Sequence, residues 1–204
     1  MKNFLIIILL FPLITFSQEQ KRLALVIGNA NYDEGTLKNP VNDALLVKQT
    51  LVSLGFDVIL DTNISNNYGF TEKVAEFGER RENYDVGLVF YAGHAIQVGA
   101  ENFLLPTKVN FKKVNDVRLK GFSVQQIMLY LESYTNQVNI LILDACRDNP
   151  FERNWNRTRS LKGAGLAKIQ APTGSLIAFS TDAGNTAADG EGKNSIYCKS
   201  LCEN

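Results

Sequence analysis

LALVIG, residues 23–28, is an unbroken apolar run that ends at a glycine. A run without polar alternation is typical of a strand buried on both faces, which occurs where helices cover each side of a parallel sheet. Four further runs are mostly apolar and are also predicted to be strands: residues 56–60 (FDVIL), 86–91 (VGLVFY), 138–143 (VNILIL) and 175–179 (SLIAF). The chain therefore contains the strands of a parallel sheet.

Helical patterns separate these strands. Asn39 is predicted to cap a helix in which Pro40 is the first residue and which ends at Gly55. The apolar stripe of this helix is predicted to comprise Val41, Ala44, Leu45, Leu51 and Leu54. The other predicted elements are helices over residues 71–81 and 123–134, the second beginning at Ser123, and a hairpin of residues 95–98 and 102–105 around Gly99. The alternation predicts an α/β fold with a doubly wound, mostly parallel sheet between two helix layers.

The composition narrows the class of protein. A chain of 204 residues with 45% apolar and 21% charged residues has room for one packed domain, and it is unlike a disordered chain or a coiled coil. Lys and Arg number 21, as do Asp and Glu, so the net charge is zero and no nucleic-acid partner is expected. There is one histidine, which excludes any metal site or relay that needs two imidazoles. Histidine chemistry in this chain must use His94.

The first 17 residues have the form of a secretory signal peptide. One lysine precedes the apolar run of residues 4–13. Thr15 and Ser17 provide small side chains at the two positions that a signal peptidase recognises before its cleavage site. The alternative, a membrane anchor, is disfavoured because the run is shorter than the ~20 residues that span a bilayer. We expect a cleaved signal over residues 1–17, a folded domain over residues 18–204, a secreted or periplasmic location, and no stable membrane anchor after cleavage.

Three cysteines in an exported chain cannot all pair with one another. Cys198 and Cys202 are four residues apart, so in a helix their Cβ atoms would lie too far apart for an unstrained disulfide. Cys146 is the cysteine to consider for chemistry.

Residues 149–173 lack helical or strand periodicity. Connections of this length are uncommon in compact domains unless they are functional or mobile. Two interpretations stay open: an ordinary solvated loop, or a processing site or substrate-facing lid. The basic residues of this segment are Arg153, Arg157, Arg159, Lys162 and Lys168.

Chemically active residue types follow two of the predicted strands. His94 comes shortly after the strand of residues 86–91, and Cys146 comes shortly after the strand of residues 138–143. In parallel sheets the carboxyl ends of the strands meet at one edge, where ligands bind. We expect His94 and Cys146 to meet there as a nucleophile and its base. Taken singly, the histidine fits an ordinary hydrogen-bonded residue and the cysteine a small buried apolar one.

Several stretches together resemble the caspase-like (C14) cysteine peptidase family, and in particular its bacterial metacaspase-like (orthocaspase) members. The resemblance covers residues 21–201. The stretches that carry it are residues 25–29 (LVIGN), 37–44 (LKNPVNDA), 55–56 (GF), 91–94 (YAGH), 144–147 (DACR), 171–174 (APTG) and 188–190 (ADG).

The resemblance implies a cysteine endopeptidase with a caspase-like αβα sandwich fold and a polypeptide substrate. His94 would be the general base and acid, Cys146 the nucleophile, and the backbone N–H groups of Ala95 and Cys146 the oxyanion donors. The family uses two carboxylates, here Asp43 and Asp144, to bind the substrate side chain before the scissile bond. Carboxylates favour a cation, so cleavage after Arg or Lys is expected. The period of a strand independently predicts that residues 144 and 146 face the same side.

The length and basic composition of the loop would suit the enzyme's own pocket, so self-processing between Arg153 and Lys168 is also predicted. Some family members need calcium, but no calcium ligands can be assigned in this sequence, so no cofactor and no metal site are predicted. The family continues beyond Cys202, so the chain is expected either to leave a sheet edge or apolar face uncovered or to be a truncated part of a longer domain.

One departure from the family pattern favours a rival function. Ala95 replaces the glycine that usually follows the catalytic histidine. A catalytically inactive caspase-like binding or scaffold module is therefore the alternative. A nucleotide-binding protein is disfavoured, because the stretch after the first strand (GNAN, residues 28–31) lacks the glycine spacing that phosphate binding needs.

Overall fold

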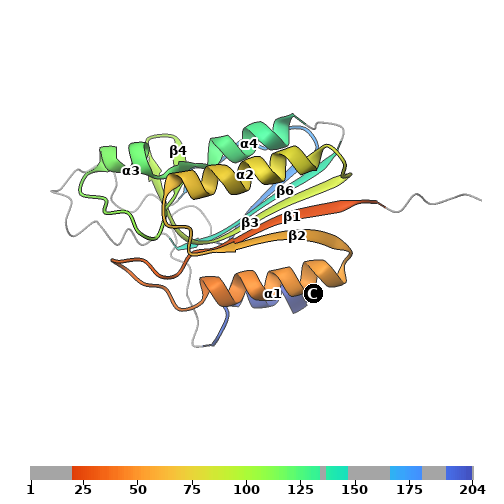
Figure 1. Ribbon diagram of the computed structural model, residues 1–204, viewed down its shortest axis with the longest axis horizontal. Helices are drawn as coiled ribbons and strands as arrows, with labels where there is room; N and C mark the ends of the chain where they lie inside the picture. The colour runs from red at the N-terminus through yellow and green to blue at the C-terminus, as the bar shows by residue number, and fades with distance from the viewer. Residues whose placement is uncertain (1–19, 134–136, 147–165, 181–191, 204) are drawn as a thin grey trace, which may run out of the picture.

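The computed structural model describes residues 20–133, 137–146, 166–180 and 192–203 of the chain. A mostly parallel sheet of seven strands lies between two helix layers (Figure 1), which confirms the predicted α/β architecture. The elements in chain order are β1 (Arg22–Gly28), α1 (Pro40–Ser53), β2 (Phe56–Thr62), α2 (Asn67–Arg81), β3 (Val86–Val98), β4 (Glu101–Leu104), α3 (Val114–Lys120), β5 (Phe122–Ser123), α4 (Val124–Glu132), β6 (Val138–Cys146), β7 (Ser175–Phe179) and α5 (Ile196–Glu203).

The parallel part of the sheet has the order β2, β1, β3, β6, β7. The end of β3 leaves this part and pairs antiparallel with β4, which in turn pairs with β5. In Figure 1, α2 and α4 cover one face of the sheet, and α1 covers the other together with α5. No helix among the described residues is long and apolar enough to span a membrane.

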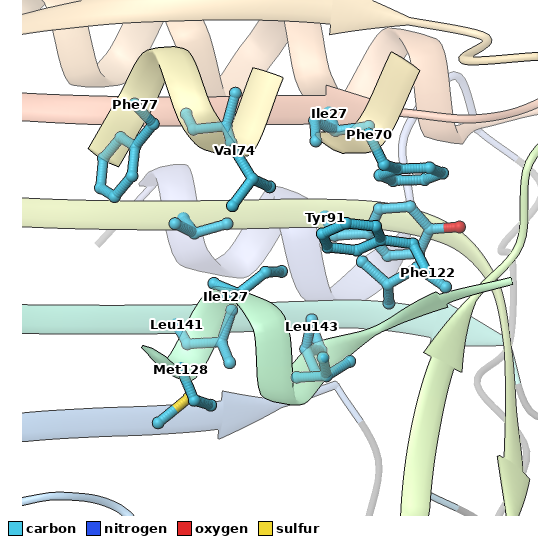
Figure 2. Packing of buried hydrophobic residues seen from close by; sticks show 14 of the residues in the cluster. Ile27, Phe70, Val74, Phe77, Tyr91, Phe122, Ile127, Met128, Leu141 and Leu143 are labelled. Carbon is cyan, nitrogen blue, oxygen red and sulfur yellow. The ribbon is translucent and has the colours of Figure 1, made fainter. Parts of the chain in front are cut away.

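Both faces of the central strands are buried, as the unbroken apolar runs predict. Successive residues alternate between two cores: Tyr91 and Leu143 pack under α2 and α4, whereas Phe90 and Ile142 pack under α1 and α5. Figure 2 shows the first of these cores. Its labelled members are Ile27, Phe70, Val74, Phe77, Tyr91, Phe122, Ile127, Met128, Leu141 and Leu143.

The predicted inward face of α1 was partly wrong. Leu45 is 43% exposed and Leu54 is 53% exposed, and the second lies beyond the last helical residue. The buried residues of the helix are Pro40, Asp43, Ala44, Val47 and Leu51. The helix is rotated so that an acidic side chain, Asp43, lies on its buried face, which an apolar pattern cannot reveal. Asn39 occupies the cap position as predicted, but its side chain makes no capping hydrogen bond.

The strand predicted over residues 86–91 continues to Val98. It therefore includes the first strand of the predicted hairpin, and residues 92–95 lie within β3 rather than in a loop after it. Gly93 has a φ of +152° at the point where β3 turns from the parallel sheet towards β4. Such a backbone angle favours glycine, so one residue allows the strand to bend without ending. The short elements α3 and β5 and the terminal helix α5 were not predicted.

Candidate active site

β3 and β6 bring the only histidine and the predicted nucleophile together. The two strands are parallel neighbours, and their register ends with His94 opposite Cys146. The residues are 52 positions apart in sequence, and the winding of the sheet makes them direct backbone partners. The backbone therefore holds both residues at the carboxyl edge of the sheet, where ligand crevices form in α/β folds.

The imidazole of His94 is oriented by a backbone carbonyl. His94 is 3% exposed, and its Nε2 lies 2.6 Å from the carbonyl oxygen of Gly35, in the segment between β1 and α1. A carbonyl oxygen only accepts hydrogen bonds, so Nε2 carries the proton of the neutral ring. Nδ1 is then the basic nitrogen, suited to take a proton from a thiol.

Two tyrosine hydroxyls hold the backbone of His94, and sequence reasoning missed both. The N–H of His94 donates to Tyr32 Oη at 2.9 Å, and its carbonyl accepts from Tyr91 Oη at 2.8 Å. The two hydroxyls lie 3.1 Å apart. A Cβ on Gly93 would lie 2.6 Å from one hydroxyl and 2.7 Å from the other, so only glycine leaves room for the pair. The ring of Tyr91 packs 6.1 Å from that of Phe70 in the core of Figure 2, which anchors the histidine to the centre of the domain.

The two predicted specificity carboxylates converge on the start of α5. Asp43 Oδ1 accepts from the backbone N–H of Ser195 at 3.0 Å and from Asn194 Nδ2 at 2.9 Å. Asp144 Oδ2 accepts from the hydroxyl of Ser195 at 2.6 Å. Both aspartates are buried, although they come from α1 and β6. Ser195 and Asn194 were not predicted as site residues; the serine before a helical apolar pattern was the one signal that could have indicated them.

Burial is the main reason why the pKa of Asp43 is raised. Removal of the carboxyl from water raises its pKa above 3.8, and the negative charge of Asp144 raises it further. Hydrogen bonds from Asn194, Ser195 and Cys198 act in the opposite direction. The pair of aspartates thus forms a buried acidic site in which each carboxylate disfavours the charge of the other.

The raised pKa of Asp43 predicts a pH-dependent stability. The folded state holds this proton more tightly than the unfolded state, so the contribution of Asp43 to stability is fully present below pH 3.8 and is lost as the pH rises through the folded pKa. Asp43→Asn keeps an oxygen for Ser195 and removes the charge that faces Asp144 and Cys198. We expect the variant to be more stable than the parent near neutral pH, with the difference shrinking in acid. Denaturant unfolding from about pH 3 to about pH 8 measures this, and a pH-independent difference would contradict it.

The two cysteines of α5 are free thiols. Cys198 is fully buried, and burial together with nearby Asp43 raises the pKa of its thiol. A thiol in such surroundings stays protonated and is a poor nucleophile. Cys202 is half-buried on the same helix. Cys146 therefore remains the cysteine whose position suits catalysis.

Ala95 follows His94 in β3 and pairs with Leu104 of β4. Its side chain is buried in the same core as Tyr91. The residue thus fits its site as a small apolar side chain, which accounts for alanine in place of the family's glycine without strain, because positive φ occurs at Gly93 rather than at Ala95.

Several predicted features lie outside the described residues: the signal over residues 1–17 and most of the long basic segment, including Arg153, Arg157, Arg159 and Lys162. The part of that segment that the structure describes, residues 166–173, is hydrogen-bonded to the rest of the domain. Asn102, which is fully buried, receives the N–H of Ala167 at 2.7 Å and donates to its carbonyl at 2.8 Å. Lys168, the next residue, is exposed.

No calcium ligands are assigned in the described part of the chain. In these residues no group of three or more His, Cys, Asp or Glu side chains is placed to hold a metal ion. Asp43 and Asp144 accept hydrogen bonds from the protein.

The comparisons with known proteins bear on the family and the fold. The caspase-domain model of peptidase family C14 matches residues 21–204. Human mucosa-associated lymphoid tissue lymphoma translocation protein 1 is 30% identical over 128 residues, which are 62% of this chain and 15% of the human protein. The mouse homologue is 28% identical over 128 residues, again 62% of this chain and 15% of its own. The chain thus corresponds to a small part of these relatives.

Solved caspase structures share the fold. Caspase-1 from Spodoptera frugiperda superposes with a TM-score of 0.63 at 16% identity, covering 90% of this chain and 68% of that chain. The Drosophila initiator caspase Dronc gives 0.60 at 10% identity, covering 91% and 66%. Because the family model spans nearly the whole chain, the protein belongs to the caspase domain family, peptidase family C14. At the family level it is a caspase-like, cysteine peptidase-type domain.

Proposed function

We propose that this domain is a cysteine endopeptidase that uses His94 and Cys146 to hydrolyse peptide bonds after Arg or Lys. The observation that carries the proposal is the register of β3 and β6, in which the two residues are direct partners. The orientation of the imidazole by Gly35 supports it further, because a positioned base beside the nucleophile is the requirement for thiol catalysis.

In the proposed reaction, Nδ1 of His94 takes the proton of the Cys146 thiol, and the thiolate attacks the carbonyl carbon of the substrate. The negative charge that develops on the carbonyl oxygen is stabilised by the N–H groups of Ala95 and Cys146. The C–N bond then breaks, and the imidazolium gives its proton to the leaving amine. Water, deprotonated by His94, finally hydrolyses the thioester and restores the thiol. These steps need no cofactor.

The buried aspartates support cationic specificity. Two carboxylates on one site attract a guanidinium or ammonium group far more strongly than an acidic or neutral side chain. Their position at the carboxyl edge of the sheet, with Asp144 two residues before Cys146, suits the binding of the residue before the scissile bond.

Export and self-processing extend the same proposal. We infer that the signal over residues 1–17 directs the domain out of the cytoplasm, and that cleavage between Arg153 and Lys168 accompanies activation. Intact-mass measurement of the purified active protein is expected to give two fragments whose masses correspond to a cut between Arg153 and Lys168. An intact chain with full activity would contradict self-processing.

The decisive experiment combines turnover with covalent labelling. We expect the protein to hydrolyse peptide reporters that end in Arg or Lys and to leave a reporter that ends in Asp uncleaved. An arginyl chloromethyl ketone is expected to alkylate Cys146, which peptide mass mapping identifies, while Cys202 stays unmodified. Absence of both turnover and labelling would favour the catalytically inactive scaffold module.

A further inference from the structure

Ser195 hydrogen-bonds to both carboxylates of the proposed specificity pocket. Its backbone N–H donates to Asp43 Oδ1, and its hydroxyl donates to Asp144 Oδ2. The serine is 6% exposed and directly precedes α5. The three residues come from the first helix, the fourth parallel strand in chain order and the C-terminal segment, so Ser195 links distant parts of the chain at this site.

The direction of each hydrogen bond follows from the partners of Ser195. Its Oγ accepts the N–H of Cys198 at 3.0 Å, which is the usual capping bond at the start of a helix. The single hydroxyl proton is therefore directed to Asp144. The 2.6 Å separation from Asp144 Oδ2 is typical of a hydroxyl bound to an ionised carboxylate.

The start of α5 also reduces the cost of placing two like charges together. Asn194 and Ser195 donate to Asp43, and the N-terminus of a helix carries a partial positive charge that stabilises anions. Buried carboxylates without such donors would be protonated or would turn towards water. Ser195 thus favours a charged pair in a fixed orientation before any substrate arrives.

We propose that Ser195 is a positioning residue for specificity: it fixes Asp43 and Asp144 in the arrangement that receives the cationic side chain of the substrate. This inference rests on the proposed cleavage after Arg or Lys. It assigns to the C-terminal segment a part in substrate selection that is separate from the Cys and His pair.

The test is the effect of Ser195→Ala on KM and on kcat with an arginyl reporter. The variant keeps the backbone N–H to Asp43 and loses the hydroxyl to Asp144. We expect KM to rise about tenfold or more, the effect of losing a hydrogen bond to a charged group, while kcat changes little. Ser195→Thr, which keeps a hydroxyl, is expected to restore most of the affinity. Active-site titration corrects for any fraction that fails to fold.

Ser123→Ala is the matched control. Ser123 caps α4 by accepting the N–H of Gln125 at 3.3 Å, so the variant loses a helix cap away from the carboxylates. We expect its KM to be unchanged. If Ser195→Ala is active and its KM is unchanged, as expected for Ser123→Ala, the positioning role is refuted while the proposed function stands.

A binding measurement gives a second readout that does not depend on turnover. Calorimetry measures the binding of agmatine, a small guanidinium compound, to two proteins. The first is the single variant Cys146→Ala, and the second carries both Cys146→Ala and Ser195→Ala. We expect agmatine to bind the first protein and to bind the second about tenfold more weakly. Equal affinity would refute the role of Ser195. Absence of binding to the first protein would refute the positioning role together with cationic specificity.

Discussion

Cys146→Ala is expected to abolish cleavage of an arginyl reporter, lowering kcat by about 10⁴-fold or more. The reason is that the variant retains the sheet, the pocket and His94 but has no group to form the thioester. His94→Ala is expected to have an effect of similar size. Without the imidazole the Cys146 thiol is poorly ionised, and no acid is present to protonate the leaving amine of the substrate. The double variant should be no worse than either single one, since the two residues act as a unit.

The matched control is Cys202→Ala, which removes a half-buried thiol from α5. It is expected to leave kcat unchanged and so to show that the loss is specific to Cys146. The measurement is steady-state hydrolysis, with circular dichroism to verify folding. Activity that survives in folded Cys146→Ala would refute the assignment of the nucleophile.

Asp144→Asn is expected to lower kcat/KM for arginyl reporters by about 100-fold or more. Asparagine has nearly the same shape and keeps an oxygen for the hydroxyl of Ser195, so the change removes charge rather than structure. A buried cation that loses its carboxylate partner pays the cost of leaving water without compensation. The preference for Arg over a neutral side chain of similar length should therefore nearly disappear.

Asp61→Asn is the control for this loss of charge. Asp61 lies on β2, at the opposite side of the parallel sheet from β6, and its Oδ1 accepts a local hydrogen bond from the N–H of Thr62. We expect its kcat/KM to match that of the parent. An Asp144→Asn enzyme that still prefers Arg by the original factor would show that selection occurs elsewhere.

The strands and most helices were predictable because they depend on local patterns. The runs at residues 23–28, 140–143 and 176–179 are apolar without interruption, and such runs are compatible with few environments other than a buried parallel strand. The continuation of β3 through residues 92–98 was missed because glycine at position 93 has the appearance of a strand end. In the fold, its φ of +152° bends the strand instead.

The pairing of His94 with Cys146 was predicted as a meeting at one edge, because strands wound in one direction bring their carboxyl ends together. The exact register was beyond sequence reasoning, since it depends on how β3 and β6 pack side by side. The contacts of Tyr32, Tyr91 and Gly35 with the histidine were missed for the same reason: each joins residues through space, and their sequence context resembles that of ordinary core or loop residues.

The sequence by itself determined the layers of this protein and the sheet edge at which His94 and Cys146 lie, because both follow from the periodicity of neighbouring residues. Only the tertiary structure decided how the acidic pair is held. Asp43, Asp144 and Ser195 meet through two hydrogen bonds between segments 51 and 152 residues apart. Such contacts depend on the helix rotation and strand register set by packing of the whole core, which no local pattern encodes.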